Sequence, residues 1–197
     1  AQSASVDKAA QRIWANCSAM MMRRQLFLDI GGFDETFFYG YEDSDLGWKI
    51  NLVGNDVMVL PTLYTYHNVL AQPGLADGRI VFHYCKNRLR SLIKNASRWS
   101  LPVRLIGYLG YSAVDLVVRS QRQAKFSALM WNIKNVRETL ELRHQIQRQR
   151  VRTDTDVFGI GSGSVFPSVP LGQHRRRPVA GAPPNEATHQ STVDDRV

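Results

Sequence analysis

The sequence predicts an α/β fold followed by amphipathic α-helices and a disordered tail. Its first part alternates short apolar runs with glycine turns, its middle repeats apolar residues at helical spacing, and its end is rich in Gly, Ser and Pro. The boundaries fall at residues 1–78, 79–152 and 153–197. With 197 residues and 44% hydrophobic content, the chain is long enough to bury one core.

The first part begins with an apolar, sulfur-rich run at residues 13–22, whose length suits a buried strand. Residues 24–30 then follow the pattern of a short helix. Gly31 and Gly32 end that helix, because glycine tolerates the backbone conformations that a stop and reversal need. An aromatic loop at residues 33–41 comes next.

A second helix is predicted from residue 42, where a run of acidic and hydroxyl side chains can accept from the free N–H groups of the first turn. Leu46, Ile50 and Val53 recur at helical spacing and give the helix one buried stripe. Gly54 marks its end. A β-branched strand at residues 56–60 should follow.

The second part, residues 79–152, is predicted to be three long helices. The first has an apolar face opposed by a basic one, as in helices that lie on anionic membranes, although a helix that faces the core has a similar pattern. Its polar face comprises His83, Lys86, Asn87, Arg90 and Lys94. Residues 101–118 are the most hydrophobic, but they are too short and too interrupted to span a bilayer, so an interfacial or partner-packed helix is preferred. Residues 126–150 form the third helix, with Leu129, Ile133, Val136 and Leu140 on one face.

Charge is unevenly distributed along the chain, which has a formal net charge of +8 and a pI near 9.8. Residues 79–152 contain sixteen Lys or Arg and three acids. This excess predicts a polyanionic partner, either an anionic membrane surface, a phosphorylated lipid carrier or nucleic acid. Nucleic acid is the least favoured, because the basic helices carry long apolar stripes and no known nucleic-acid motif.

The two cysteines, Cys17 and Cys85, are far apart and lack the spacing of metal ligands, so neither a disulfide framework nor a zinc site is predicted. The chain starts without a basic-then-apolar leader, so nothing marks it for secretion. Residues 153–197 have too few apolar side chains to offset the cost of ordering and are predicted to be a disordered tail.

Five carboxylates gather between Asp34 and Asp45, and they could form a solvated acidic loop or a site. A metal site on Asp43 and Asp45 is possible only at the helix start, because residues two apart on a helix point to different sides. Alternatively, one carboxylate of the Glu42 and Asp43 pair is a general base. The similar pair Asp154 and Asp156 lies in the predicted tail and is interpreted as chance.

The aromatic loop offers a binding surface beside these carboxylates. Gly40 would let the loop approach a substrate closely, and Tyr41 and Trp48 could stack on a sugar ring, unless they pack in the core. His67 follows an extended segment and is either a structural residue or a ligand for Mn²⁺ or Mg²⁺. As a ligand it depends on carboxylates from elsewhere.

The order and spacing of these pieces resemble the C-terminal half of the inverting family 2 glycosyltransferases of the GT-A fold. The resemblance is carried by NCSAMMMRR at residues 16–24, GGFDE at 31–35, FYGYEDSDL at 38–46, Gly54 and the segment that ends at His67. It covers about residues 13–68. The basic helices are similar to the extension on bacterial members that build cell-surface polysaccharides.

The resemblance implies a mechanism in which a carboxylate deprotonates an acceptor hydroxyl, which attacks a nucleotide-sugar while a divalent metal, Mn²⁺ or Mg²⁺, stabilises the departing diphosphate. By position, Asp43 is the expected base and Glu42 the second candidate. His67 is expected to complete the metal shell.

The resemblance also implies an acceptor site at the start of the second helix. Gly40, Tyr41, Asp45 and Trp48 are the expected acceptor-binding residues, with Asp45 also capping or orienting the loop. The acceptor would be a saccharide or a lipid-linked sugar.

The family's nucleotide-binding N-terminal half has no counterpart in the sequence, so we expect an acceptor-side fragment or one part of a split enzyme that needs that half for transfer. Its expected location is the cytoplasmic face of the plasma membrane, as a peripheral protein. The alternative is a catalytically inactive adaptor derived from a glycosyltransferase. The donor sugar, the acceptor and the linkage are not specified by the sequence.

Overall fold

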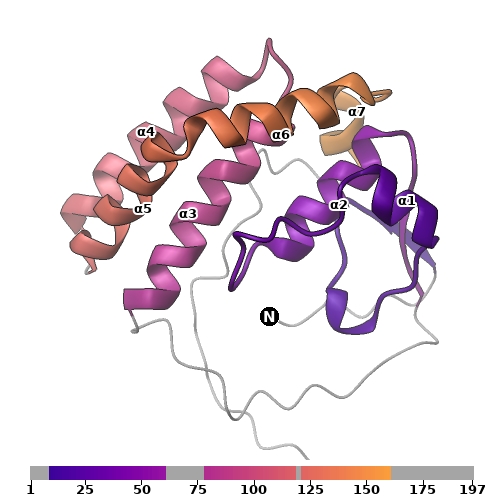
Figure 1. The fold of residues 1–197 in the computed structure, drawn as a ribbon, viewed down its shortest axis with the longest axis horizontal. Coiled ribbons are helices and arrows are strands. Elements are labelled where there is room, and N and C mark those ends of the chain that lie inside the picture. The colour runs from indigo at the N-terminus through magenta and orange to yellow at the C-terminus, as the bar shows by residue number, and fades with distance from the viewer. Residues whose placement is uncertain (1–8, 61–77, 119–120, 161–197) are drawn as a thin grey trace, which may run out of the picture. The chain divides into compact units, whose positions relative to one another are not determined.

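The computed structural model describes residues 9–60, 78–118 and 121–160 of the chain. The described residues are mostly helical, with a small two-stranded sheet. Figure 1 shows the helices labelled in chain order. The elements are β1 (Ala10–Arg12), η1 (Cys17–Ala19, a single 3₁₀ turn), α1 (Arg24–Asp29), α2 (Glu42–Leu52), β2 (Val57–Val59), α3 (Gly78–Asn95), α4 (Leu101–Val118), α5 (Arg122–Lys134), α6 (Val136–Arg148) and α7 (Asp154–Gly159).

The sheet pairs β1 with β2 in antiparallel register, with Gln11 opposite Met58. The strand predicted at residues 13–22 is wrong, because that run is an irregular segment that contains only the turn η1. The segment packs on a helix instead of pairing with a strand. A Cβ added to Gly47 of α2 would lie 2.5 Å from Trp14 Cβ and 2.6 Å from Ile13 O, so the two backbones touch.

The helices α1 and α2 lie close to where the sequence predicts them. The predicted stripe of α2 is also present, since Leu46 and Ile50 are buried and Val53 is half-buried at its end. The burial of α2 is wider than one stripe, because all eight residues from Asp45 to Leu52 are buried. This helix is therefore enclosed, and only its first turn reaches the surface.

The helix α3 lies at the centre of the described residues and contacts α2, α4, α5 and α6. In Figure 1, α5 and α6 follow one another across α3, and α2 lies on its other side. Leu89, Leu92 and Ala96 join the hydrophobic core with Leu46, Leu52, Ile146 and others.

The third predicted helix, residues 126–150, is two helices that meet at Asn135. The Asn135 side-chain amide donates to Trp131 O at 2.8 Å, which is a local hydrogen bond of the kind that competes with a continuous helix. The predicted apolar face is largely exposed: Ile133, Val136 and Leu140 are in water, whereas Asn132 and Thr139 are buried.

The predicted tail is wrong at its start, because residues 154–159 form the helix α7. Thr153 and Asp156 form a capping box, in which the Thr153 hydroxyl accepts from Asp156 N and the Asp156 carboxylate accepts from Thr153 N. Val157 is fully buried in the core. The rest of the predicted tail, residues 161–197, lies outside the described residues.

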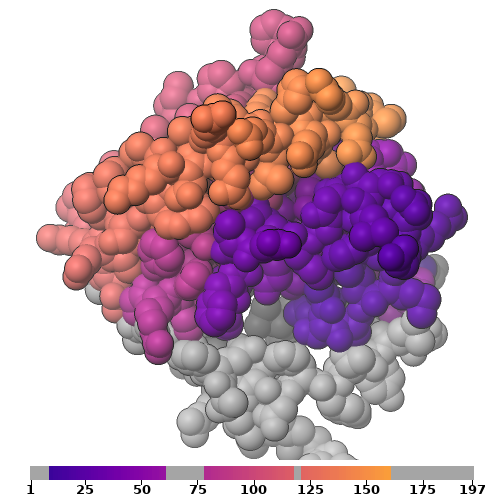
Figure 2. All heavy atoms as spheres, viewed as in Figure 1, coloured from indigo at the N-terminus to yellow at the C-terminus, as the bar shows by residue number. Residues whose placement is uncertain are grey.

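The N-terminal residues and the last two helices pack together. In Figure 2 the indigo and violet surface of residues 9–60 meets the orange surface of α6 and α7. Val151 N donates to Leu52 O at 2.7 Å, and Arg152 forms an ion pair with Asp56 at 2.7 Å. Among the described helices, none is long and apolar enough to cross a bilayer.

Candidate functional site

The start of α2 carries the two carboxylates predicted to act as a base, Glu42 and Asp43. The residue before them, Tyr41, has φ of 75°, a left-handed conformation that is uncommon for any residue except glycine. Such a conformation costs about 1–3 kcal/mol and is found most often at functional sites. The packing around this turn must hold the strained conformation in place.

Asp43 is oriented by the irregular segment that packs on α2. Cys17 N donates to Asp43 Oδ1 at 3.2 Å. The carboxylate lies in the first turn of α2. A carboxylate has about four acceptor positions, so this bond leaves Asp43 able to accept a proton from another group.

Glu42 lies beside Asp43 in a drier environment. Its Oε2 atom is buried and accepts no hydrogen bond from the described residues. Burial raises the pKa of Glu42, and the charge of Asp43 raises it further. Glu42 therefore holds its proton more tightly than an ordinary glutamate.

The loop before these carboxylates is fixed by α3. Asn87 Nδ2 donates to Tyr39 O at 3.1 Å and to Gly40 O at 2.7 Å. Gly40 has φ of 73°, and a Cβ there would lie 2.8 Å from the Tyr84 ring. Glycine is therefore required for the close approach of this loop to α3. The substrate contact of Gly40 stays a prediction.

Aromatic side chains surround this loop and the start of α3. The rings of Phe38 and His83 are 5.2 Å apart, and those of Tyr39 and Tyr84 are 6.0 Å apart in an edge-to-face arrangement. Phe38 is 83% exposed, so its ring is available to a ligand. Tyr41 is half-buried, and burial raises the pKa of its phenol to about 12, with the charge of Arg88 and a hydrogen bond to Arg88 opposing the rise.

Asp45, predicted to bind the acceptor, is instead a buried structural residue with 1% exposure. It accepts from Lys94 Nζ at 3.0 Å and from Asn95 Nδ2 at 2.8 Å. Burial alone would raise the pKa of Asp45, but the charges of Lys94 and Lys49 outweigh it and lower the pKa. The carboxylate joins α2 to α3 and is enclosed by these partners.

Trp48, predicted to stack on a sugar, is also in the core, with 7% exposure. Its ring lies 5.2 Å from that of Phe158 in α7, nearly perpendicular to it. The sequence left open whether Trp48 stacks on a sugar or packs in the core, and the structure shows that it packs in the core. Once α7 packs on α2, this side of the helix is covered.

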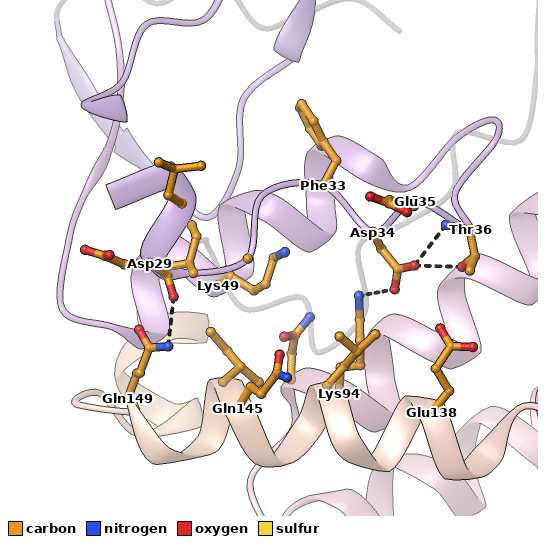
Figure 3. A pocket seen from close by; sticks show the side chains of 16 residues that line it. Asp29, Phe33, Asp34, Glu35, Thr36, Lys49, Lys94, Glu138, Gln145 and Gln149 are labelled. Carbon is orange, nitrogen blue, oxygen red and sulfur yellow. Dashed lines mark hydrogen bonds and ion pairs between the residues drawn. The ribbon is translucent and has the colours of Figure 1, made fainter. Parts of the chain in front are cut away.

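Asp34 of the GGFDE motif forms a second buried centre. It accepts from Arg90 Nε at 2.8 Å, Lys94 Nζ at 2.6 Å and Thr36 Oγ1 at 2.7 Å. The Thr36 and Lys94 bonds are drawn in Figure 3. Burial would raise the pKa of Asp34, yet the charge of Lys94 and the hydrogen bonds hold it well below its ordinary value.

Beside Asp34 the structure has a cavity of about 480 Å³. Figure 3 shows it between the end of α1, the loop from Gly31 to Thr36 and the side of α6. Lys49 and Lys94 line it, but their ammonium groups already bind Gly32 O and the two buried aspartates. The cavity is separate from the Glu42 and Asp43 pair, so it does not extend the site at the start of α2.

Most cations of α3 face the core, which is the alternative that the sequence left open beside a helix lying on a membrane. Lys86, Asn87, Arg90 and Lys94 are between 0 and 3% exposed. Arg90 also donates to Glu138 at 2.5 Å and to Thr139 at 2.8 Å, while Lys86 binds Thr36 O. These side chains face inward because carboxylates and loop carbonyls supply their partners.

A metal site is not assembled from the part of the chain that the structure describes. No three His, Cys, Asp or Glu side chains converge there, and the two buried aspartates are occupied by lysines and an arginine. His67, the predicted metal ligand, lies outside the described residues. The Mn²⁺ or Mg²⁺ site therefore remains a prediction of the sequence.

The sequence did not identify three residues that shape the candidate site: Cys17, Tyr84 and Asn87. Tyr84 and Asn87 are three apart in α3 and thus share a side of the helix, which is the signal that could have paired them. Cys17 contributes only its backbone N–H to Asp43, a role that no side-chain pattern reveals.

Comparison with known proteins gives one kind of match. The chain is similar to N-acetylglucosaminyl-diphospho-decaprenol L-rhamnosyltransferase from two strains of Mycobacterium tuberculosis, at 26% identity over 115 residues. The match covers 57% of this chain and 38% of the relative. No family model and no solved structure matches the chain. The chain is thus a distant relative of a glycosyltransferase, and its matched part corresponds to little more than a third of that enzyme.

Proposed function

We propose that this chain is the acceptor-side part of an inverting, family 2 glycosyltransferase of the GT-A fold. It would transfer a sugar from a nucleotide-sugar to a saccharide or lipid-linked acceptor during the synthesis of a cell-surface polysaccharide. The observation that carries the proposal is the similarity to the mycobacterial rhamnosyltransferase, whose name describes a lipid-linked sugar as acceptor. The strained turn beside two carboxylates supports it.

In this function Asp43 is the base. Its carboxylate takes the proton of the acceptor hydroxyl as the hydroxyl oxygen bonds to the anomeric carbon, and the bond from that carbon to the diphosphate breaks. The nucleoside diphosphate departs with the bonding electrons. The hydrogen bond from Cys17 N–H orients Asp43 for this step.

Glu42 remains the second candidate for the base. Because its pKa is raised, ionised Glu42 is a stronger base than an ordinary glutamate. The same shift keeps Glu42 protonated over more of the pH range. Gly40, Tyr41 and the exposed ring of Phe38 would form the acceptor side of the pocket. We leave Asp45 and Trp48 out of the pocket, because both are buried.

The donor site is proposed to lie in a further part of the protein, corresponding to the N-terminal half of the relative. A divalent metal, with His67 as one ligand, belongs to the same proposal. We further propose a peripheral location on the cytoplasmic face of the plasma membrane, where a lipid-linked acceptor would be reached.

The test is sugar transfer by this chain joined to the N-terminal half of the mycobacterial relative, with nucleotide-linked rhamnose as donor and an N-acetylglucosaminyl-diphospho-polyprenol as acceptor. Asp43→Asn should lower kcat by at least about a hundredfold, as expected for the loss of a general base. Glu35→Gln is the matched control, since Glu35 is exposed in the adjacent loop, and it should retain activity.

Two results would contradict the proposal. Full activity of Asp43→Asn would remove Asp43 as the base, and a Glu42→Gln variant that loses activity instead would assign the base to Glu42. A folded joined protein that transfers no sugar would favour the alternative, an inactive module that docks on a membrane or on another transferase.

A further inference from the structure

The exposed side of α4 is apolar along its length. Of residues 101–117, those that are exposed are all uncharged. Val103, Ile106, Val114 and Val117 are 72, 71, 62 and 73% exposed. Their spacing places them on one face of the helix. A continuous face of this kind on a protein surface marks an interaction site.

The polar side chains of α4 point the other way. Arg104 lies over the Phe158 ring at 4.1 Å, and Asp115 forms an ion pair with Lys125 at 2.6 Å. On the same inner side, the Tyr108 hydroxyl donates to Cys85 O of α3 at 3.2 Å. In α4 the apolar side faces water, whereas an ordinary surface helix turns its polar side to water.

Basic and aromatic residues flank the apolar face. Arg98 lies 4.5 Å from the Trp99 ring, which is 77% exposed, at the start of α4. Arg122 follows its end and is exposed. Residues 96–135 contain six Lys or Arg and a single acid, Asp115, which Lys125 neutralises. Tryptophan and arginine at the ends of an apolar helix face are typical of the interface between lipid headgroups and acyl chains.

We propose that the exposed face of α4 docks on an anionic lipid bilayer, with the helix lying in the plane of the interface. Val103, Ile106, Val114 and Val117 would enter the boundary of the acyl chains, while Arg98 would contact lipid phosphates. The proposal places the membrane contact on α4, which the sequence predicts to be interfacial or packed on a partner, and not on α3, most of whose cations are buried. It rests on the proposed function only in that a lipid-linked acceptor would lie at the same membrane.

The contacts of α4 place this surface close to the candidate site. Arg88 of α3 lies 5.6 Å from the Tyr108 ring and 5.2 Å from the Tyr111 ring, and it is hydrogen-bonded to Tyr41. Tyr41 immediately precedes Glu42. Arg88 therefore links α4 to the turn that carries the carboxylates.

Charge favours a bilayer over a second copy of the chain as the occupant. If two copies met face to face through this surface, Arg98 and Arg122 of one copy would approach the arginines of the other and repel them. Asp115 could not offset this repulsion, because it is already paired with Lys125. An anionic bilayer complements both the apolar face and the arginines. The experiment must therefore distinguish docking on a bilayer from association between copies of the chain.

The test is co-sedimentation of the full 197-residue chain with vesicles of phosphatidylcholine, with and without phosphatidylglycerol, in the absence of donor and acceptor. The chain should bind the anionic vesicles, and salt should weaken the binding. Ile106→Glu with Val114→Glu should lower it by at least about tenfold. Met21→Glu with Leu28→Glu adds the same charges at exposed positions outside α4 and should bind like the wild type.

Three results would overturn the proposal: no binding of the wild type to anionic vesicles, unchanged binding of the α4 variant, or equal losses in both variants. Light scattering after size-exclusion chromatography measures the oligomeric state of the wild type and of the α4 variant. A wild-type dimer that the α4 variant converts to a monomer would assign the face to a second copy. Because no sugar is transferred in this experiment, it can fail while the proposed function holds, and the reverse.

Discussion

The helices α3 and α4 have the same length, 18 residues, and both turn charged side chains inward, but only α4 leaves large aliphatic side chains exposed. In α3, Lys86, Arg90 and Lys94 are inside the protein. In α4, aliphatic residues such as Val103 and Val117 are outside. An amphipathic pattern thus establishes that two faces of a helix differ, and it leaves open which of them meets the rest of the protein.

The difference follows from what each helix has opposite it. The inner face of α3 meets Asp34 and Asp45, which pair with its cations and offset the cost of removing charge from water. The outer face of α4 has no such partner among the described residues. The acidic motifs of the first 60 residues therefore determine the orientation of α3. For α4, the proposed partner is an anionic bilayer.

The largest effect should come from breaking the α3 network. Arg90→Ala would leave Asp34 with one cation fewer and would open a void beside Thr139, so we expect a loss of about 3–5 kcal/mol in the free energy of unfolding. Urea denaturation measures it. Arg137→Ala is the matched control, because its ion pair with Glu141 is exposed and should contribute less than about 1 kcal/mol.

If Arg90→Ala and Arg137→Ala cost the same, the buried ion pairs would not be what holds α3 in this orientation. The comparison between α3 and α4 would then need another cause. A large loss in Arg90→Ala alone supports the view that the first 60 residues and α3 fold as one cooperative unit.

The network also predicts a dependence on acid. The pKa values of Asp34, Asp45 and Asp154 are lowered in the folded state by partners that outweigh burial. The stability they contribute is complete above the ordinary carboxyl pKa of about 4 and is lost as the pH falls below it. Glu42 acts in the opposite sense, because its pKa is raised and its contribution is lost as the pH rises.

Urea titrations from neutral pH to about pH 3 test this balance. The wild type should lose stability on acidification, and Asp34→Asn should lose less, so that the difference between the two proteins narrows as the pH falls. Parallel curves for the two proteins would mean that Asp34 is not ionised and paired in the folded state.

Much of the helical content could be predicted from sequence, since α1, α2, α3 and α4 follow local signals of periodicity, acidic first turns and glycine stops. The failures are non-local. Residues 13–22 lack strand structure because they pack on Gly47 of α2, and α7 is ordered because its core residue Val157 fits against the remainder of the fold. Neither contact is visible within a window of neighbouring residues.

The candidate site divides in the same way. The sequence correctly located Glu42 and Asp43 at the start of a helix, because carboxylates in a first turn are a local signal. It named Asp45 and Trp48 as acceptor-binding residues, with core packing left open for Trp48, and both are buried by α3 and α7. Predicting which carboxylates stay accessible requires knowing where the cations of α3 lie.

The smallest predicted effect contrasts two glycines that lie within helices. A Cβ at Gly110 of α4 meets nothing within 4 Å, whereas one at Gly47 of α2 collides with residues 13 and 14. Gly110→Ala should therefore raise the free energy of unfolding by about 0.5–1 kcal/mol, since alanine favours the helix and the surface is open. Gly47→Ala should lower it by about 1–3 kcal/mol through overpacking. A loss in Gly110→Ala would show that this face of α4 is already covered in the isolated chain, and it would then be unavailable to a bilayer.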